Sequence, residues 1–110
     1  MSLFAVIREA GPGWVPGGIH QQPAVGEHAA FMDGLASDGF VLVAGPLAGS
    51  ERGRLRVLLI ADGEGEDEVH RRLADDPWQR GHQLLTVSVE PWTILAGAER
   101  LEAGTRRRNS

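Results

Sequence analysis

Two features of this sequence combine residue types that could move a proton: an apolar stripe that contains a histidine, and a pair of carboxylates before a proline. His28 lies at helical spacing from the apolar residues Met32 and Leu35, which predicts that its side chain points inward from a helix. A histidine on such a face is partly desolvated, and this favours the neutral imidazole that acts as a base near pH 7.

The carboxylates lie in Leu73-Ala-Asp-Asp-Pro-Trp78. Because the residue before a proline avoids helical geometry, we expect a helix to end here and Asp76 to be extended at a corner. Asp76 could then accept a ring N–H from His28 and fix the tautomer of the histidine. Asp75 could take either role, and the Asp-Pro register favours Asp76 for the cleft and Asp75 for solvent.

Both residues also have an ordinary structural interpretation. A single inward histidine is often satisfied by a backbone carbonyl, and an aspartate before a proline is often a capping or turn residue. As a pair, His28 and Asp76 would be an acid–base dyad, and catalysis of this kind contributes roughly 10²–10⁴-fold to a rate.

The composition excludes several classes of function. The 110 residues form one domain, and the absence of cysteine excludes thiolate metal sites and fits a reducing compartment. The net charge of −4 argues against nucleic acid as the main partner. The apolar run of residues 3–7 is too short for a signal peptide or a membrane span, so we expect a cytoplasmic protein without a membrane partner. No close His/carboxylate spacing suggests a metal, and no cofactor is expected.

The elements that must position these residues follow from periodicity and turn signals. We expect strands over residues 3–8, 40–46, 54–61 and 82–95, and helices over residues 24–37 and from residue 66 to the Asp-Pro corner. In the last strand, Leu85, Val87 and Val89 are expected to share the buried face. The order β-α-β-β-α-β predicts the ferredoxin-like α+β sandwich, with a four-stranded antiparallel sheet and both helices on one face. Because the other face must also be covered, we expect a homodimer of the dimeric α/β-barrel type, with Trp92 at its interface.

The walls of a cleft between sheet and helices can also be named. Trp14, Trp78 and either Phe31 or Met32 would line it, and such a lining favours a small aromatic or cyclic compound. Trp14 lies in residues 11–18, a loop with four glycines and two prolines. This loop could be a lid, or Trp14 could simply pack the loop against the protein.

The end of the chain differs from the rest. Residues 1–96 carry all of the predicted elements and form the expected domain. Residues 97–110 are polar and aperiodic, which predicts a short helix followed by a disordered tail. The Arg106–Arg108 run within it is typical of a solvated segment.

Four ordered segments give the chain a resemblance to a known family. His28-Ala-Ala-Phe31, Gly39-Phe-Val-Leu-Val-Ala-Gly-Pro46, Leu73-Ala-Asp-Asp-Pro-Trp78 and Val89-Glu-Pro-Trp92 together resemble the YciI-like (YCII-related) family over roughly residues 3–95. The resemblance implies the dimeric α/β-barrel form of the ferredoxin-like fold. It also implies an active-site histidine–aspartate pair, which matches His28 and Asp76, and a chemistry that includes lyase-type removal of chloride from a ring.

The chain departs from the family in ways that leave its substrate undetermined. Many relatives carry an arginine three residues before the histidine, where this chain has Val25. Two functions therefore remain possible for this chain. One is a lyase or isomerase-like enzyme that uses His28 and Asp76, and the other is a non-catalytic dimeric module that binds a small ligand or serves an accessory role.

Overall fold

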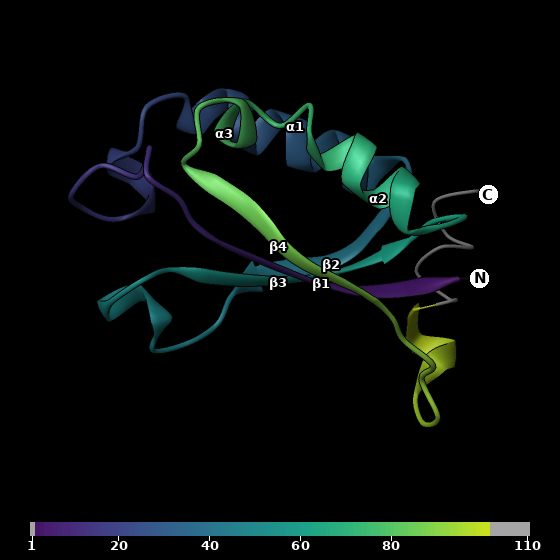
Figure 1. The fold of residues 1–110 in the computed structure, drawn as a ribbon. Coiled ribbons are helices and arrows are strands. Elements are labelled where there is room, and N and C mark those ends of the chain that lie inside the picture. Colours follow the sequence, from purple (N-terminus) through teal and green to yellow (C-terminus); the bar gives the residue numbers. More distant parts are fainter. Residues whose placement is uncertain (1, 102–110) are drawn as a thin grey trace.

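The computed structural model describes residues 2–101 and shows one antiparallel sheet beneath a layer of helices (Figure 1). The strands are β1 (Leu3–Ala10), β2 (Val41–Pro46), β3 (Arg56–Asp62) and β4 (Leu84–Pro91), in the spatial order β2-β3-β1-β4. The helices are α1 (Val25–Ser37), α2 (Glu66–Leu73) and α3 (Pro77–Arg80), with 3₁₀ turns η1 (Ile19–Gln21) and η2 (Ser50–Arg52). The strand order and the helices on one face confirm the predicted ferredoxin-like α+β fold.

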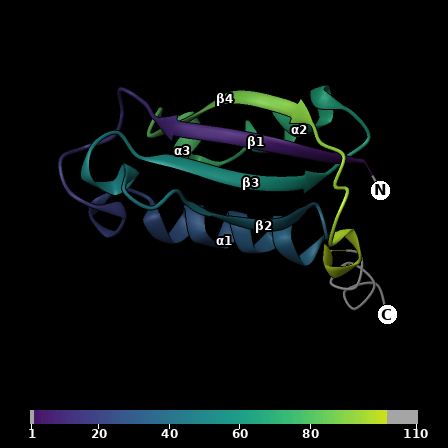
Figure 2. The same cartoon turned by 90° about the horizontal axis from the view of Figure 1, so that it is seen from below.

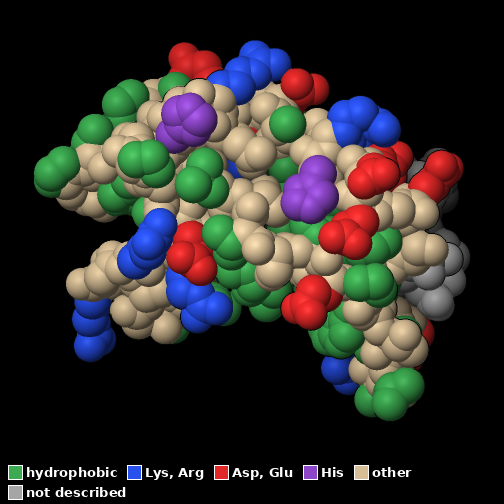
Figure 3. Space-filling model, viewed as in Figure 1, with side chains coloured by type: hydrophobic (Ala, Val, Ile, Leu, Met, Phe, Trp, Pro, Cys, Tyr) green, Lys and Arg blue, Asp and Glu red, His purple; other side chains and the backbone are tan. Residues whose placement is uncertain are grey.

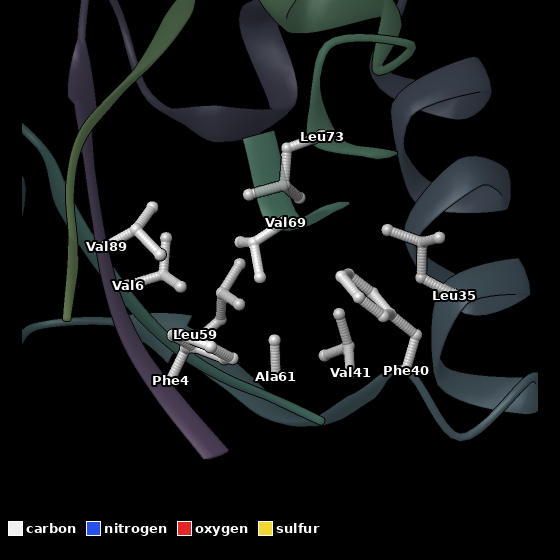
Figure 4. Packing of buried hydrophobic residues seen from close by; sticks show 10 residues of the cluster. All are labelled: Phe4, Val6, Leu35, Phe40, Val41, Leu59, Ala61, Val69, Leu73 and Val89. Carbon is white, nitrogen blue, oxygen red and sulfur yellow. The ribbon is translucent and has the colours of Figure 1, made fainter. Parts of the chain in front are cut away.

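The main core fills the space between the sheet and the helices α1 and α2 (Figure 4). It consists of side chains that are buried because strand and helix periodicity turn them toward one another. Its members are Phe4, Val6, Leu35, Phe40, Val41, Leu59, Ala61, Val69, Leu73 and Val89. A second cluster of buried residues, Ala10, Leu55, Trp78 and Leu84, marks a separate apolar region.

The expected alternation along the last strand is wrong, because β4 contains a β-bulge. Ile7 of β1 pairs with Ser88 whereas Arg8 pairs with Thr86, so Val87 is an extra residue. A bulge changes the face to which the following side chains point. Val87 is therefore 50% exposed while Val89 is buried in the core. The strand also ends earlier than predicted, at Pro91, which has no N–H to donate to a ladder.

The glycine-rich loop after β1 is fastened to the start of β4. The backbone N–H groups of Gly11 and Gly13 donate to the carbonyls of Gln83 and His82 over 2.9 and 2.8 Å. A Cβ at Gly13 would collide with the carbonyl oxygen of Gly81, so the close approach requires glycine there. Gln22, which is buried, bonds both the N–H and the carbonyl of Val15. The described conformation is thus a loop held at several points.

The second face of the sheet is not covered by α1, α2 or α3 (Figure 2), and the segment that follows β4, which ends in a short helical stretch at residues 98–101, lies over one end of it. Strand alternation places Ile7, Leu58 and Ile60 on this face, opposite the core residues Val6 and Leu59. Figure 3 shows the face hollowed between the β2–β3 connection and the segment that follows β4. Within residues 2–101, no helix is long and apolar enough to cross a membrane. The predicted disordered tail with Arg106–Arg108 lies outside the described residues.

Candidate active site

Asp76 lies between two helices rather than only at the end of one. The sequence predicted its extended backbone, and φ −63° and ψ 127° agree. A capping role for Asp76 was one of the two interpretations of the sequence, but the helix that it caps, α3, with Pro77 at the first helical position, was not predicted. The Oδ1 of Asp76 accepts the backbone N–H of Trp78 over 2.9 Å, as capping residues do. The side chain is completely buried.

His28 of α1 meets this carboxylate. Its Nδ1 lies 2.8 Å from Oδ1 and 3.0 Å from Oδ2 of Asp76. An ionised carboxylate only accepts hydrogen bonds, so Nδ1 carries a proton, and in the neutral imidazole Nε2 has the lone pair. The imidazole is 17% exposed and stacks on the indole of Trp78, with ring centroids 3.9 Å apart and 7° between the planes. Trp78 is fixed in turn by a 2.8 Å hydrogen bond from its Nε1 to the carbonyl of Pro23.

Arg8 completes the site, and the sequence analysis did not identify it. Its side chain is 1% exposed, and Nη1 donates to Oδ2 of Asp76 over 2.8 Å. Nη2 donates to Oε1 of Gln79 over 3.1 Å, and the same oxygen accepts the Thr86 hydroxyl over 3.0 Å. A signal was present in the sequence, since strand alternation from Phe4 and Val6 turns Arg8 toward the helices. An arginine at such a position needs a buried anion.

The electrostatics keep Asp76 ionised. Burial alone would raise the pKa of its carboxyl. The hydrogen bond from His28, the charge of Arg8 and the N–H of Trp78 outweigh burial, so the pKa lies below its usual value of 3.8. Burial lowers the pKa of the Arg8 guanidinium below its usual range, and the charge of Asp76 opposes this effect. Near neutral pH the pair is thus an arginine cation and an aspartate anion.

A cavity of about 210 Å³ opens beside these residues. Apart from His28 and Arg8, its lining is apolar, and it comprises Ile19, Met32, Ala44, Gly45, Pro46, Leu55, Val57, Trp78 and Leu84. This volume lies below the range of roughly 300–1,000 Å³ that is usual for ligand pockets. The cavity suits a compound about the size of one ring.

The structure separates the four predicted wall residues. Met32 and Trp78 line the cavity. Phe31 instead packs against the main core. Trp14 meets Trp78 edge to face at 5.5 Å and lines a smaller neighbouring hollow of about 80 Å³. Ile19 and Leu55 line both spaces.

Asp75 and the other three histidines lie apart from the site. Asp75 is 70% exposed and pairs with Arg80 over 3.1 Å, so it faces solvent as the Asp-Pro register suggested. His20, His70 and His82 are exposed. Among residues 2–101, no group of three His, Asp or Glu side chains could hold a metal ion. The chemistry that the site offers is proton transfer by one oriented imidazole beside an apolar space.

Comparisons with known proteins support the fold. No family model matches the chain, and no curated protein matches it. A solved structure that does match is 5-chloro-2-hydroxyhydroquinone dehydrochlorinase (TftG) from Burkholderia phenoliruptrix AC1100, in complex with 2,5-dihydroxybenzoquinone. It is 22% identical, with a TM-score of 0.53, and the match covers 88% of this chain and 97% of that chain. At this identity the match shows a shared fold.

Proposed function

We propose that this protein is a small-molecule enzyme of the YciI-like kind. In this proposal Nε2 of His28 takes and returns a proton on a small cyclic or aromatic compound, and Asp76 orients the ring. The observation that carries the proposal is the geometry of His28. Its Nδ1 is held by a buried carboxylate while the ring borders an apolar cavity. This is the arrangement of a base with a fixed tautomer.

A lyase step fits the site best. His28 would remove a proton from the substrate, the electron pair of the broken bond would form a double bond, and a leaving group would depart with its own bonding pair. The solved structure of similar fold is named as a dehydrochlorinase, which is an enzyme of this class. The cavity volume and the ring of Trp78 favour a one-ring substrate.

The first prediction concerns His28. In a screen of halogenated and hydroxylated one-ring compounds, with halide release and ring absorbance as readouts, we expect turnover by the wild type. His28→Gln should lower kcat/KM by about 10²–10⁴-fold, because the amide cannot act as a base. The matched control is His70→Gln on the exposed face of α2, which should leave kcat/KM unchanged.

The same experiment distinguishes the alternative. If one-ring compounds bind to the wild type and to His28→Gln with similar affinity and neither protein turns them over, the protein is a ligand-binding module. The apolar lining of the cavity would serve such a module equally well.

We further propose that the protein is a homodimer joined through the sheet face opposite α1, α2 and α3. On this face Ile7 pairs with Leu58, and Ala5 pairs with Ile60, in the register of β1 and β3. An apolar sheet face requires a cover. A second copy offers the same apolar rows in a self-complementary arrangement.

A further inference from the structure

A dyad of histidine and aspartate does not need a buried arginine, yet Arg8 is buried against Asp76. Burying a charged group is costly unless it is paired, and arginine is rarely this buried. Arg8 is 1% exposed, and its Nε has no hydrogen-bond partner within the described residues. Its two other nitrogens are bound to Asp76 and Gln79. Nε is out of reach of solvent, and although Arg8 lines the cavity, its Nη groups donate to Asp76 and Gln79, so its charge lies against the carboxylate that holds His28.

Arg8 and His28 share one oxygen atom. Oδ2 of Asp76 accepts from Nη1 of Arg8 over 2.8 Å and lies 3.0 Å from Nδ1 of His28. With a neutral imidazole, the three side chains have no net charge. When the imidazole gains a proton, the same buried group carries a charge of +1. A dyad without the arginine would change from −1 to zero, so the arginine makes protonation of the histidine less favourable.

Apart from Arg8 and His28, the described residues that line the cavity carry no charge, and Glu27, which precedes His28 in α1, is exposed. The cavity lining contributed by β2, β3 and β4 is uncharged, and the groups around the guanidinium, Gln79 and Thr86, are neutral. Asp75 and Arg80 pair with each other at the exposed surface. Glu9 follows Arg8 in β1, so it lies on the opposite face of the sheet, where it is 3.4 Å from Arg54.

We propose that Arg8 is a positioning residue that lowers the proton affinity of His28 by occupying the charge of Asp76. The carboxylate then orients the imidazole without stabilising the imidazolium as an unpaired carboxylate would. The depressed pKa of Asp76, to which Arg8 contributes, agrees with this division of its charge. The catalytic meaning rests on the proposed function, because a base that readily gives up its proton is regenerated quickly for the next turnover.

The test measures the protonation of His28 directly, by NMR titration of its ring in protein without ligand. Removing the charge with Arg8→Met should raise the titration midpoint by about 1–2 pH units, a rise of roughly 10- to 100-fold in proton affinity. Arg8→Gln, which keeps a donor for Asp76, should raise it in the same direction. Arg80→Met is the matched control, because this arginine is 68% exposed. In that variant the titration midpoint of His28 should equal the midpoint in the wild type.

Arg8→Lys separates charge from shape. It keeps the positive charge and loses the planar fork, so a midpoint within about 0.5 units of wild type supports an effect of charge. A midpoint that rises in Arg8→Lys as much as in Arg8→Met overturns the proposal. An unchanged midpoint in Arg8→Met or Arg8→Gln also overturns it. If neither uncharged variant folds, Arg8→Lys decides by its own midpoint: a rise of more than about 0.5 units above wild type overturns the proposal, and a smaller change supports it.

The outcome does not depend on finding a substrate. A protein that turns nothing over but shows the raised midpoint would refute the proposed function and support the role of Arg8. Where turnover is found, the acid limb of the kcat/KM profile should move upward in Arg8→Met by the same amount as the NMR midpoint. Turnover with an unmoved acid limb and midpoint would refute the role of Arg8 alone.

Discussion

At the scale of single residues, the site depends on the Asp76 carboxylate. It accepts from a backbone N–H of α3, from the guanidinium on β1 and from the imidazole on α1. Three segments that are distant in the sequence are thereby joined by one side chain. Replacing Asp76 should therefore lower the stability of the protein as well as its activity.

Asp76→Asn is therefore expected to destabilise the protein at neutral pH. Removing one partner of a buried ion pair costs about 3–5 kcal/mol, because the remaining charge stays buried and unpaired. Urea unfolding at pH 7 should show this loss in the free energy of unfolding. Asp75→Asn, at a 70% exposed position, is the control and should change it by less than about 0.5 kcal/mol.

The effect should depend on pH with a defined sign. The folded state holds the pKa of Asp76 below 3.8, so its stabilising contribution is complete above that pH. The contribution is lost as the pH falls from 3.8 through the lower folded-state pKa. The difference between wild type and Asp76→Asn should shrink in that range. A difference that stays constant from pH 7 to pH 3 would show that Asp76 is not held ionised by its neighbours.

The sequence predicted some of these residues and missed others for physical reasons. His28 could be found because helical periodicity turns it inward, and Asp76 because a proline restricts the residue before it. Arg8 lay within the expected strand of residues 3–8 and was not identified, although alternation from Phe4 and Val6 indicates that its side chain points to the same face. The degree to which Arg8 is enclosed follows from the fold, since β1 lies between β3 and β4 and the Arg8 side chain is 1% exposed.

At the scale of elements, the loop of residues 11–18 is shaped by how closely two backbones approach. Gly13→Ala should destabilise the protein by about 1–3 kcal/mol, because the new methyl group meets the carbonyl oxygen of Gly81 and backbone cannot easily yield. Thermal and urea unfolding would measure the loss. A neutral or stabilising effect would mean that the loop is not held against β4.

A contrasting substitution lies in α1. Gly34 is inside the helix, and nothing lies within 4 Å of a Cβ built there. Gly34→Ala should raise the free energy of unfolding by roughly 0.5–1 kcal/mol, because alanine loses less backbone freedom in a helix. Together the two variants test whether the space around each glycine, rather than glycine content, decides stability.

Elements were easier to predict than their irregularities. Periodicity located the four strands and the two long helices. The bulge at Val87 and the short helix α3 were missed, because both depend on partners distant in the sequence. Val87 is an extra residue in the pairing of β4 with β1, and α3 begins at the N-cap that Asp76 provides.

At the scale of the whole molecule, the asymmetry of the two sheet faces governs association. Light scattering should give a mass near twice the 11.8 kDa of one chain at tens of micromolar. Leu58→Glu should shift the protein toward the monomer, because it places a charge opposite Ile7 in the centre of the proposed interface. Val15→Glu, in the loop after β1, is the control and should not change the mass. A wild type with the mass of one chain at these concentrations would contradict the dimer.

The stack of His28 on Trp78 has a further consequence for the study of this protein. Indole emission responds to the protonation and the movement of a ring in van der Waals contact with it, and these rings lie 3.9 Å apart. Trp78 is 2% exposed whereas Trp92 is 45% exposed, so their emission differs in wavelength and in access to a soluble quencher. The protein thus carries an intrinsic fluorophore at its candidate base, and occupancy of the cavity can be followed optically before any substrate is known.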